Sequence, residues 1–273
     1  MNLLQTMKYP VKHPVLTQLI NYFWEIKSDQ RVGVDHKLLP VCNADLILHF
    51  SSAIKYISAG NLESEQKRIH LNGIRSRFQI IRQSGPLDVL GISFLPLGVY
   101  PFFKTPLIEF ANKNIEVVLF AHEFTSRIEE KLGLAGDTSE KLELLETELL
   151  KILNTEEIPS EEVCLIFRYF HMSIDHMDIQ EFCERFGVHP RRLERIFAKY
   201  IGISPKQFQR LHRFQNVIRQ LEVKRFPSLT EVAYENEYYD QNHFIKEFKE
   251  FAGCAPSQFI HEKKAVRQIL QYS

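Results

Sequence analysis

The chain contains one structural pattern twice between residues 178 and 260. The first copy covers residues 178–205 and the second covers residues 228–256. Equivalent residues lie 50 positions apart before the turn and 51 after it, as for Gly202 and Gly253. An internal repeat of this size indicates two copies of one supersecondary unit. The chain is therefore expected to build two similar helical units with one extra residue in the second turn.

Each copy has the pattern of two helices joined by a tight turn. A capping box opens each copy, with Asp178 followed by Glu181 and Ser228 followed by Glu231. Gly187 can supply the positive φ that ends the first helix of the first copy. The second helix of each copy carries apolar residues four apart and a polar opposite face. These signals predict two helix-turn-helix units.

Positive charge is concentrated on the first copy and the segment that follows it. Residues 185–225 contain 11 Lys or Arg and 2 Asp or Glu, in a chain whose formal net charge is zero. A run of cations can be a solvated helical face, but cations clustered on a helix-turn-helix unit indicate a phosphate-binding surface. The distribution therefore favours nucleic acid as the partner.

Residues 160–264 resemble the tandem helix-turn-helix domain of AraC-type bacterial transcription regulators. Three stretches carry the resemblance: R-I-F-A-K-Y-I-G-I-S-P, R-L-H-R-F-Q-N-V and Y-Y-D-Q-N-H-F-I-K-E-F-K-E-F-A-G-C-A-P. The resemblance implies a bacterial, cytoplasmic regulator that binds double-stranded promoter DNA, and that contacts RNA polymerase if it is an activator. Two residues depart from the family pattern. Glu237 replaces the usual glycine and needs a positive φ or a different turn, and Phe214 replaces a small residue.

The second helix of the first copy supplies one set of candidate DNA-binding residues. Arg191, Glu194 and Arg195 lie on the side away from its apolar residues, and they match base-facing positions of the family. Arginine can donate two hydrogen bonds to guanine, and glutamate can accept one from cytosine. Arg192 and Lys199 are expected to contact phosphates or to be solvated.

The second helix of the second copy supplies the other set, beginning after Asp240 as its N-cap. Outward-facing Gln241, Asn242 and Lys246 are expected to read DNA, and His243 to contact a phosphate. Acidic neighbours predict weaker binding by this copy: Glu235, Glu237, Glu247 and Glu250. A linking helix over residues 206–223 is expected to separate the two reading helices by about one DNA turn, ~34 Å.

The N-terminal part shows β-sheet signals. Alternating apolar runs predict strands over residues 44–50, 54–58, 74–81 and 89–95. We expect them to form an antiparallel barrel or sandwich whose interior could hold a small molecule. A helix is predicted over residues 15–26, with Trp24 as a core anchor. The proline-rich segment of residues 96–115 is either a ligand lid or a buried connector.

Two helices are expected after these strands, over residues 117–132 and 139–153. The second carries a short apolar seam, which can pack on its own domain or form a dimer contact: Leu142, Leu145, Leu149 and Ile152. Residues 154–160 read as a linker, and Ser160 as the N-cap of the next helix. The N-terminal region also resembles, more loosely, the β-rich N-terminal domains of one group of AraC-type regulators. That resemblance implies a sensing or dimerisation role and names no effector.

No catalytic residue, metal site or cofactor is predicted. The four cysteines are scattered and include no C-x-x-C pair, and no glycine-rich phosphate loop or nucleophile elbow occurs. His49 and His70 read as isolated imidazoles, and His171 and His176 are spaced five apart, which keeps them from sharing a helix face. No apolar run reaches about 18 residues, so no membrane partner is expected.

The sequence therefore predicts an α+β chain with two domains. Residues 1–155 are expected to form a β-rich barrel or sandwich-like sensing or dimerisation domain with flanking helices, and residues 156–273 an all-α tandem helix-turn-helix domain. We expect a one-component regulator that binds promoter DNA in two successive major-groove segments, responds to a small-molecule effector and forms a homodimer. Two alternatives stay open: a DNA-repair type enzyme fused to the DNA-binding domain, and a regulator that dimerises without a ligand.

Overall fold

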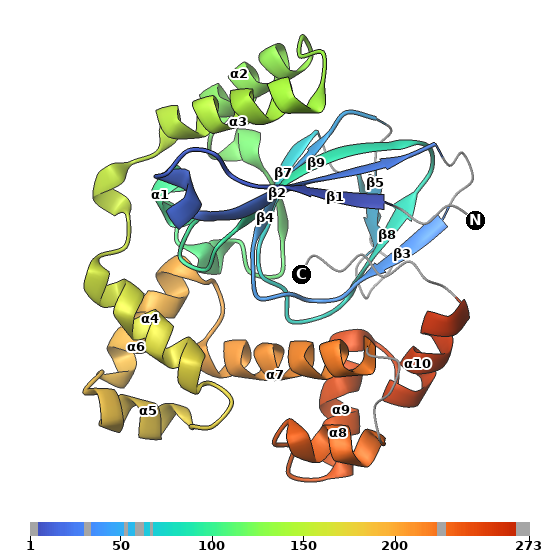
Figure 1. Cartoon of the computed structure of the whole chain (residues 1–273), viewed down its shortest axis with the longest axis vertical. Coiled ribbons are helices and arrows are strands. Elements are labelled where there is room, and N and C mark those ends of the chain that lie inside the picture. The colour runs from blue at the N-terminus through green and yellow to red at the C-terminus, as the bar shows by residue number, and fades with distance from the viewer. Residues whose placement is uncertain are drawn as a thin grey trace.

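Two antiparallel sheets form the N-terminal half of the molecule in the computed structural model (Figure 1). The structure describes residues 5–29, 34–51, 54–57, 63–65, 68–222 and 228–265. One sheet has six strands in the order β1-β2-β9-β4-β7-β10, and the other has four in the order β3-β8-β5-β6. The strands are β1 Gln5–Tyr9, β2 Ile20–Ser28, β3 Val34–Leu38, β4 Asp45–His49, β5 Ile54–Ile57, β6 Glu63–Glu65, β7 Ile69–Asn72, β8 Gln79–Gln83, β9 Leu87–Phe94 and β10 Asn114–Glu116.

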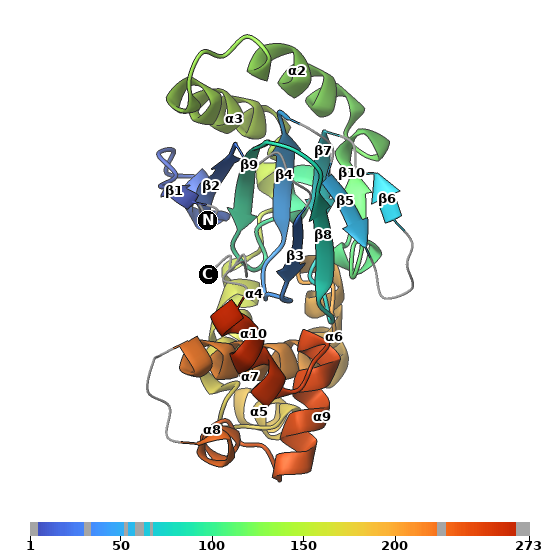
Figure 2. The same cartoon turned by 90° about the vertical axis from the view of Figure 1, so that its right-hand side faces the viewer.

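The sheets face each other without closing into a barrel, so the sandwich alternative is the one that the chain adopts (Figure 2). Side chains alternate between two apolar layers along the central strands. On β4, Ile47 packs between the sheets, whereas Leu46 and Leu48 pack under the helices that cover the six-stranded sheet. Trp24 is fully buried between the sheets, which confirms its prediction as a core anchor.

The predicted helix over residues 15–26 is wrong. This segment forms a short 3-10 turn at Leu16–Gln18 and then strand β2, which pairs with both β1 and β9. Phe23 is buried under the covering helices and Trp24 between the sheets, so both faces of the segment are apolar. A strand buried on both faces lacks the alternation by which strands are recognised in sequence.

Three of the four predicted strands correspond to β4, β5 and β9. The run over residues 74–81 is only partly a strand, because β8 begins at Gln79 and Ile74 lies in the preceding loop. The segment of residues 96–115 places Phe102 and Phe103 in the core, as expected of a connector, and its Pro96 borders the cavity described below. Ser58 and Val223, where two predicted elements end, lie outside the described residues.

Two helices cover the six-stranded sheet and correspond to the predicted ones: α2 His122–Leu132 and α3 Thr138–Ile152. Leu145 and Leu149 of α3 are fully buried in the core of this same domain. The apolar seam of α3 therefore packs on its own sheet. Glu148 of α3 is also buried, and its carboxylate accepts hydrogen bonds from Arg127 and Lys131 of α2.

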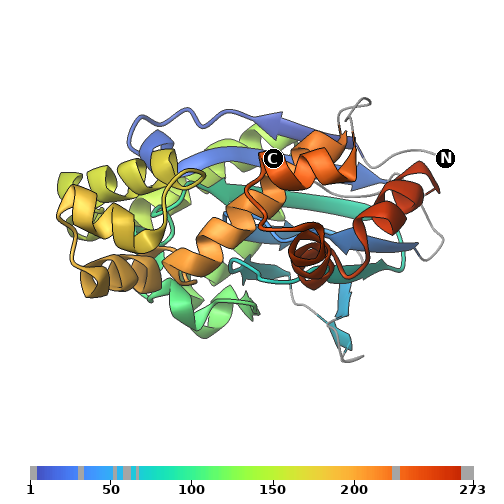
Figure 3. The same ribbon diagram turned by 90° about the horizontal axis from the view of Figure 1, so that it is seen from below.

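The C-terminal half is helical and lies below the sheets in Figure 1. Figure 3 shows its two helix-turn-helix units at opposite ends of the linking helix α7. Its helices are α4 Glu161–Ser173, α5 Ile179–Phe186, α6 Pro190–Tyr200, α7 Pro205–Glu222, α8 Leu229–Glu235, α9 Gln241–Ala252 and α10 Pro256–Ala265. The linking helix predicted over residues 206–223 corresponds to α7. The side chains of Ser160, Asp178 and Ser228 accept the capping hydrogen bonds expected of them.

The helical half shares its core with the β-rich half. Leu39, Ile74 and Leu97, all from the N-terminal half, are buried in the same apolar cluster as the helices of the C-terminal half. The β-rich half and the helical half, on either side of the boundary expected at residue 155, therefore pack closely on each other.

Candidate DNA interface and interdomain cavity

Helix α6 presents one exposed polar face. Pro190 occupies its first turn, and Leu193 and Phe197 are fully buried. Arg191, Glu194 and Arg195 are exposed on the opposite side, as the sequence predicted. Because the first turns of a recognition helix contact base edges in helix-turn-helix proteins, this face is the candidate reading surface of the first unit.

Two other predicted residues of α6 are held by contacts within the chain. One guanidinium nitrogen of Arg192 lies 2.5 Å from a carboxylate oxygen of Glu162 on α4. The ammonium of Lys199 lies 3.3 Å from Glu157 and 4.2 Å from the ring centroid of Tyr100. Lys199 therefore faces the N-terminal half, while the exposed arginines of α6 face solvent.

Helix α9 presents the corresponding face of the second unit. The Asp240 side chain accepts a hydrogen bond from the backbone N–H of His243, which confirms the expected N-cap. Phe244 and Phe248 are fully buried. The four predicted contact residues of this helix are exposed: Gln241, Asn242, His243 and Lys246.

The turn before α9 contains the backbone strain that the sequence suggested. Glu237 has a φ of 57°, in the left-handed region where a side chain is unfavourable. The following residue, Tyr238, is buried, and its ring packs on Phe244 with centroids 5.1 Å apart. The turn thus keeps helix-turn-helix geometry without the usual glycine.

The acidic residues of the second unit differ in their surroundings. Glu247 is buried, and its carboxylate lies 2.7 Å from Nε of Arg210 on α7. The same guanidinium lies 2.6 Å from Glu250. The single positive charge of Arg210 offsets one of the four acidic charges that are predicted to weaken DNA binding. The sequence signals Arg210 only as part of the family pattern, because its partners lie 37 and 40 residues away.

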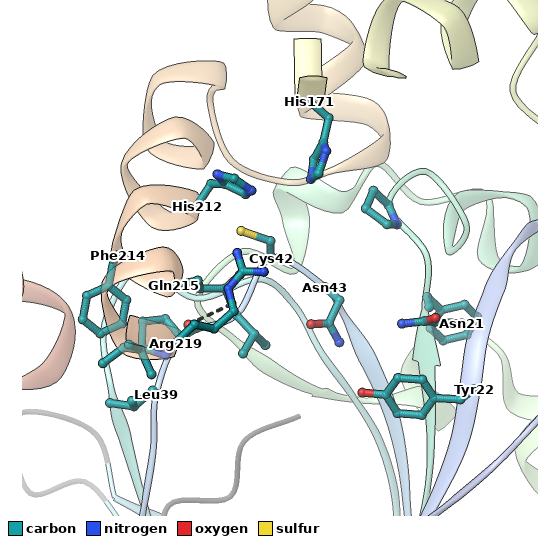
Figure 4. A pocket seen from close by; sticks show the side chains of 15 residues that line it. Asn21, Tyr22, Leu39, Cys42, Asn43, His171, His212, Phe214, Gln215 and Arg219 are labelled. Carbon is teal, nitrogen blue, oxygen red and sulfur yellow. Dashed lines mark hydrogen bonds between the residues drawn. The ribbon is translucent and has the colours of Figure 1, made fainter. Parts of the chain in front are cut away.

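A cavity of about 320 Å³ lies between the two halves of the molecule (Figure 4). His171 of α4 and His212 and Arg219 of α7 border it on the helical side, with the two imidazole centroids 5.0 Å apart. Its lining consists of Asn21, Tyr22, Leu39, Pro40, Val41, Cys42, Asn43, Phe94, Pro96, His171, His212, Phe214, Gln215, Ile218 and Arg219.

The two histidines of this cavity have different neighbours. Burial lowers the pKa of His171, and the neighbouring His212 lowers it further. His212 instead has Asp175 at 3.0 Å from its Nδ1 atom. No single stretch of sequence could reveal this site, because its walls come from β2, β9, α4, α7 and the loop before β4.

The structure also brings together the two histidines that the sequence predicts to be isolated imidazoles. His49 and His70 lie on the neighbouring strands β4 and β7, with their rings stacked at a centroid distance of 5.2 Å. The Tyr56 hydroxyl lies 2.7 Å from Nε2 of His70. Within the described part of the chain, no group of three His, Cys, Asp or Glu side chains is placed to hold a metal ion.

No helix among the residues placed by the structure is long and apolar enough to cross a membrane.

Comparison with known domain families gives two matches. Residues 182–262 match a family described as a helix-turn-helix domain, and residues 12–116 match a domain of unknown function (DUF6597). No curated protein matches the chain.

Several solved structures resemble this one at low sequence identity. ToxT from Vibrio cholerae O395 is 14% identical, with 89% of this chain and 98% of that chain covered and a TM-score of 0.46. Wild-type ToxT from Vibrio cholerae strain SCE256, bound to an unsaturated fatty acid, is 13% identical, with coverages of 89% and 96% and a TM-score of 0.45. The AraC-like transcriptional activator CuxR is 13% identical, with coverages of 81% and 88% and a TM-score of 0.28.

The family matches agree with the resemblance carried by the repeat and with the two helix-turn-helix units of the fold. The chain therefore carries an AraC-type helix-turn-helix domain in its C-terminal part, which supports a DNA-binding transcription regulator, and a domain of unknown function in its N-terminal part.

Proposed function

We propose that this regulator reads two successive major-groove segments of promoter DNA, one with α6 and one with α9. The observation that supports the proposal is the pair of exposed polar faces at the first turns of these two helices, in units joined by the single helix α7. In the first segment Arg191, Glu194 and Arg195 contact base edges. In the second, Gln241 and Asn242 do so, with His243 and Lys246 near the phosphates.

Selection of bound sequences from a random duplex pool tests this reading. Wild-type protein is expected to enrich a two-part site about one DNA turn long, ~10 base pairs between the centres of its parts. Arg195→Ala should relax the sequence preference of one part and Gln241→Ala that of the other. Enrichment of a single part, or relaxation of the same part by both variants, would contradict two-segment reading.

The interdomain cavity suggests how DNA binding is regulated. It has apolar walls from Leu39, Phe94 and Ile218, and the basic side chains of His212 and Arg219 border the same space. Such a site suits a small organic acid whose carboxylate meets the basic groups and whose apolar body meets the walls. We propose that the effector is a molecule of this class, and that its binding changes how the two halves of the chain are arranged.

Calorimetric titration of the full chain tests the effector. Aliphatic carboxylates of increasing chain length are expected to bind, and the matched alcohols to bind at least tenfold more weakly, which corresponds to about 1.4 kcal/mol. Arg219→Ala should reduce this preference, and Leu134→Ala, which alters an exposed side chain outside the cavity, should not. Absence of binding by every acid would favour the alternative of a regulator without a ligand.

The remaining partners stay predictions. They are a homodimer, RNA polymerase in the case of activation, and a cytoplasmic location on the nucleoid. We propose no catalytic activity for the chain. The alternative of a fused DNA-repair enzyme predicts methyl transfer from alkylated DNA, and an assay with such DNA would detect it.

A further inference from the structure

The C-terminal end of α9 is in direct contact with the β-rich half. The backbone N–H of Phe78, just before β8, donates a hydrogen bond to the carbonyl oxygen of Phe251 at 2.9 Å. The Phe78 ring occupies the space beside Gly253, where a Cβ atom would lie only 2.2 Å from the ring. Gly253 also has a φ of 73°. The close approach and the positive φ each require glycine at this position.

A cation from the second sheet holds the same ring. The ammonium of Lys37 on β3 lies 5.1 Å from the centroid of Phe78, within the range of a cation–π interaction. The same ammonium lies 3.8 Å from the sulfur of Cys254, which follows Gly253. The contact therefore joins β3, the start of β8 and the end of α9.

The C-terminal end of α6 makes a corresponding contact. Gly202 has a φ of 96°, and a Cβ atom there would lie 2.6 Å from the carbonyl oxygen of Leu107. The rings of Tyr100 and Tyr200 meet edge to face with centroids 5.3 Å apart. Gly202 and Gly253 are equivalent positions of the repeat. The β-rich half thus touches the same point of each helix-turn-helix unit.

These two contacts lie at the opposite ends of α6 and α9 from their candidate reading residues. Figure 1 shows both units below the sheets, with α5 and α8 farthest from them. Helix α7 is one connection between the units, and the β-rich half supplies a second through Leu107 and Phe78. Two connections restrict the rotation of one reading helix relative to the other more than α7 does alone.

We infer that Phe78 is a positioning residue for DNA recognition. Through its contact with α9, the β-rich half selects DNA sites by the spacing between their two segments. This inference rests on the two-segment reading proposed above. Inserting one base pair between the segments moves the second by about 3.4 Å and rotates it by about 34°. A protein whose units are held at two places cannot follow that displacement without breaking one contact.

Binding of full-length protein to designed duplexes tests the inference. The duplexes carry the enriched two-part site, the same site with one base pair added or removed between its parts, and a version with only the first part intact. The proteins are wild type, Phe78→Ala, Phe78→Leu and the control Leu134→Ala, whose exposed side chain lies in the loop between α2 and α3. Thermal unfolding of each variant reports whether it is folded.

Wild type and Leu134→Ala are expected to lose about tenfold in affinity when the spacing changes, comparable to one mismatched base pair. Phe78→Ala should lose about threefold or less in affinity when the spacing changes, and the loss for Phe78→Leu should lie between those of wild type and Phe78→Ala. All four proteins should bind the duplex with only the first part intact equally well. An unchanged spacing penalty in Phe78→Ala, or in Phe78→Leu if the alanine variant does not fold, overturns the positioning role. A wild-type protein that ignores loss of the second part instead overturns two-segment reading itself.

Discussion

Glu237 holds the turn before α9 in a conformation that is unfavourable for any residue with a Cβ atom. Its φ is 57°, its side chain is exposed, and its carboxylate lies 3.5 Å from His176, which is also exposed. Exposed ion pairs contribute little to stability. The backbone strain costs about 1–2 kcal/mol, and glycine would remove it at an entropic cost of about 0.5–1 kcal/mol.

Glu237→Gly is therefore expected to raise the free energy of unfolding by about 0.5–1 kcal/mol in urea denaturation. The matched variant is Glu237→Ala, which also removes the carboxylate but keeps a Cβ atom at positive φ. It should give no increase. An equal gain from both variants would assign the effect to loss of the acidic charge, and the turn would then carry no measurable strain.

Asp45 on β4 is a buried carboxyl group whose ionisation is linked to stability. Burial raises its pKa to about 7, although hydrogen bonds from Trp24 and Ser93 oppose the rise. Because the pKa in the folded state lies above the usual value of about 4, the folded state binds the proton more tightly than the unfolded chain does. The resulting stability is fully present below pH 4 and is lost as pH rises through 7.

Asp45→Asn cannot ionise, so its stability should not show this loss. We expect the stability of the variant relative to wild type to rise by about 4 kcal/mol between pH 4 and pH 8, because the pKa of Asp45 is raised from about 4 to about 7. Free energies of unfolding at pH 4, 6 and 8 measure the difference. Asp29→Asn, at an exposed position, is the control and should follow the wild-type curve. Parallel curves for Asp45→Asn and wild type would contradict the linkage.

At the scale of elements, Arg210 connects the linking helix to the second reading helix. Its guanidinium pairs with buried Glu247 and with Glu250, both on α9. Arg210→Ala leaves the Glu247 carboxylate buried without this cation, a change that costs about 3 kcal/mol when a buried pair is broken. We expect unfolding at lower urea concentration and weaker discrimination at the second DNA segment, with the first segment read normally.

Lys206→Ala is the matched control for that change, because it removes an exposed cation from the first turn of the same helix. Both variants reduce the positive charge of α7 by one. If both variants lose affinity equally at both DNA segments, Arg210 acts on DNA through its charge. If Arg210→Ala loses affinity only at the second DNA segment, Arg210 acts by orienting α9.

The helical elements could be predicted because their signals are local. Capping residues, the positive-φ glycines and apolar residues four apart lie within one turn of the structure that they determine, as at Asp178 and Gly187. Strand β2 could not be recognised in this way. Its apolar residues serve two different cores, and their spacing of three and four residues imitates a helix. The pairing partners of β2 on β9 lie about 65 residues away in sequence, as for Trp24 and Gly91.

The features of the candidate site also differ in whether local sequence signals reveal them. The exposed residues of α6 and α9 follow from helical periodicity once the helices are located. The interdomain cavity, the contact between Phe78 and Gly253, and the pairing of Arg192 with Glu162 depend on tertiary packing. No pattern within either segment signals these contacts. In the sequence, Gly253 has the pattern of a residue that ends a helix at positive φ. The close approach of the Phe78 ring, which is the second reason for glycine at this position, leaves no pattern in the sequence.

At the scale of the whole molecule, binding to DNA depends on how charge is distributed, because the formal net charge is zero. Only cations that face phosphates release counterions, and the logarithm of the binding constant then falls with the logarithm of salt concentration by about 0.9 per phosphate neutralised. We expect a steep salt dependence for the full chain despite its neutrality. An affinity independent of salt would contradict a phosphate-anchored interface.

One cation of α9 and one of α6 sharpen this test. Lys246 is exposed and is proposed to lie near a phosphate, whereas Arg192 lies 2.5 Å from Glu162 and so has its charge offset within the protein. Lys246→Ala should reduce the salt slope by about 0.9, and Arg192→Ala by less than half of that. Titrations of both variants on the selected DNA site measure the slopes. An equal reduction would mean that Arg192 leaves Glu162 to bind a phosphate, and DNA binding would then be coupled to the contact between α4 and α6.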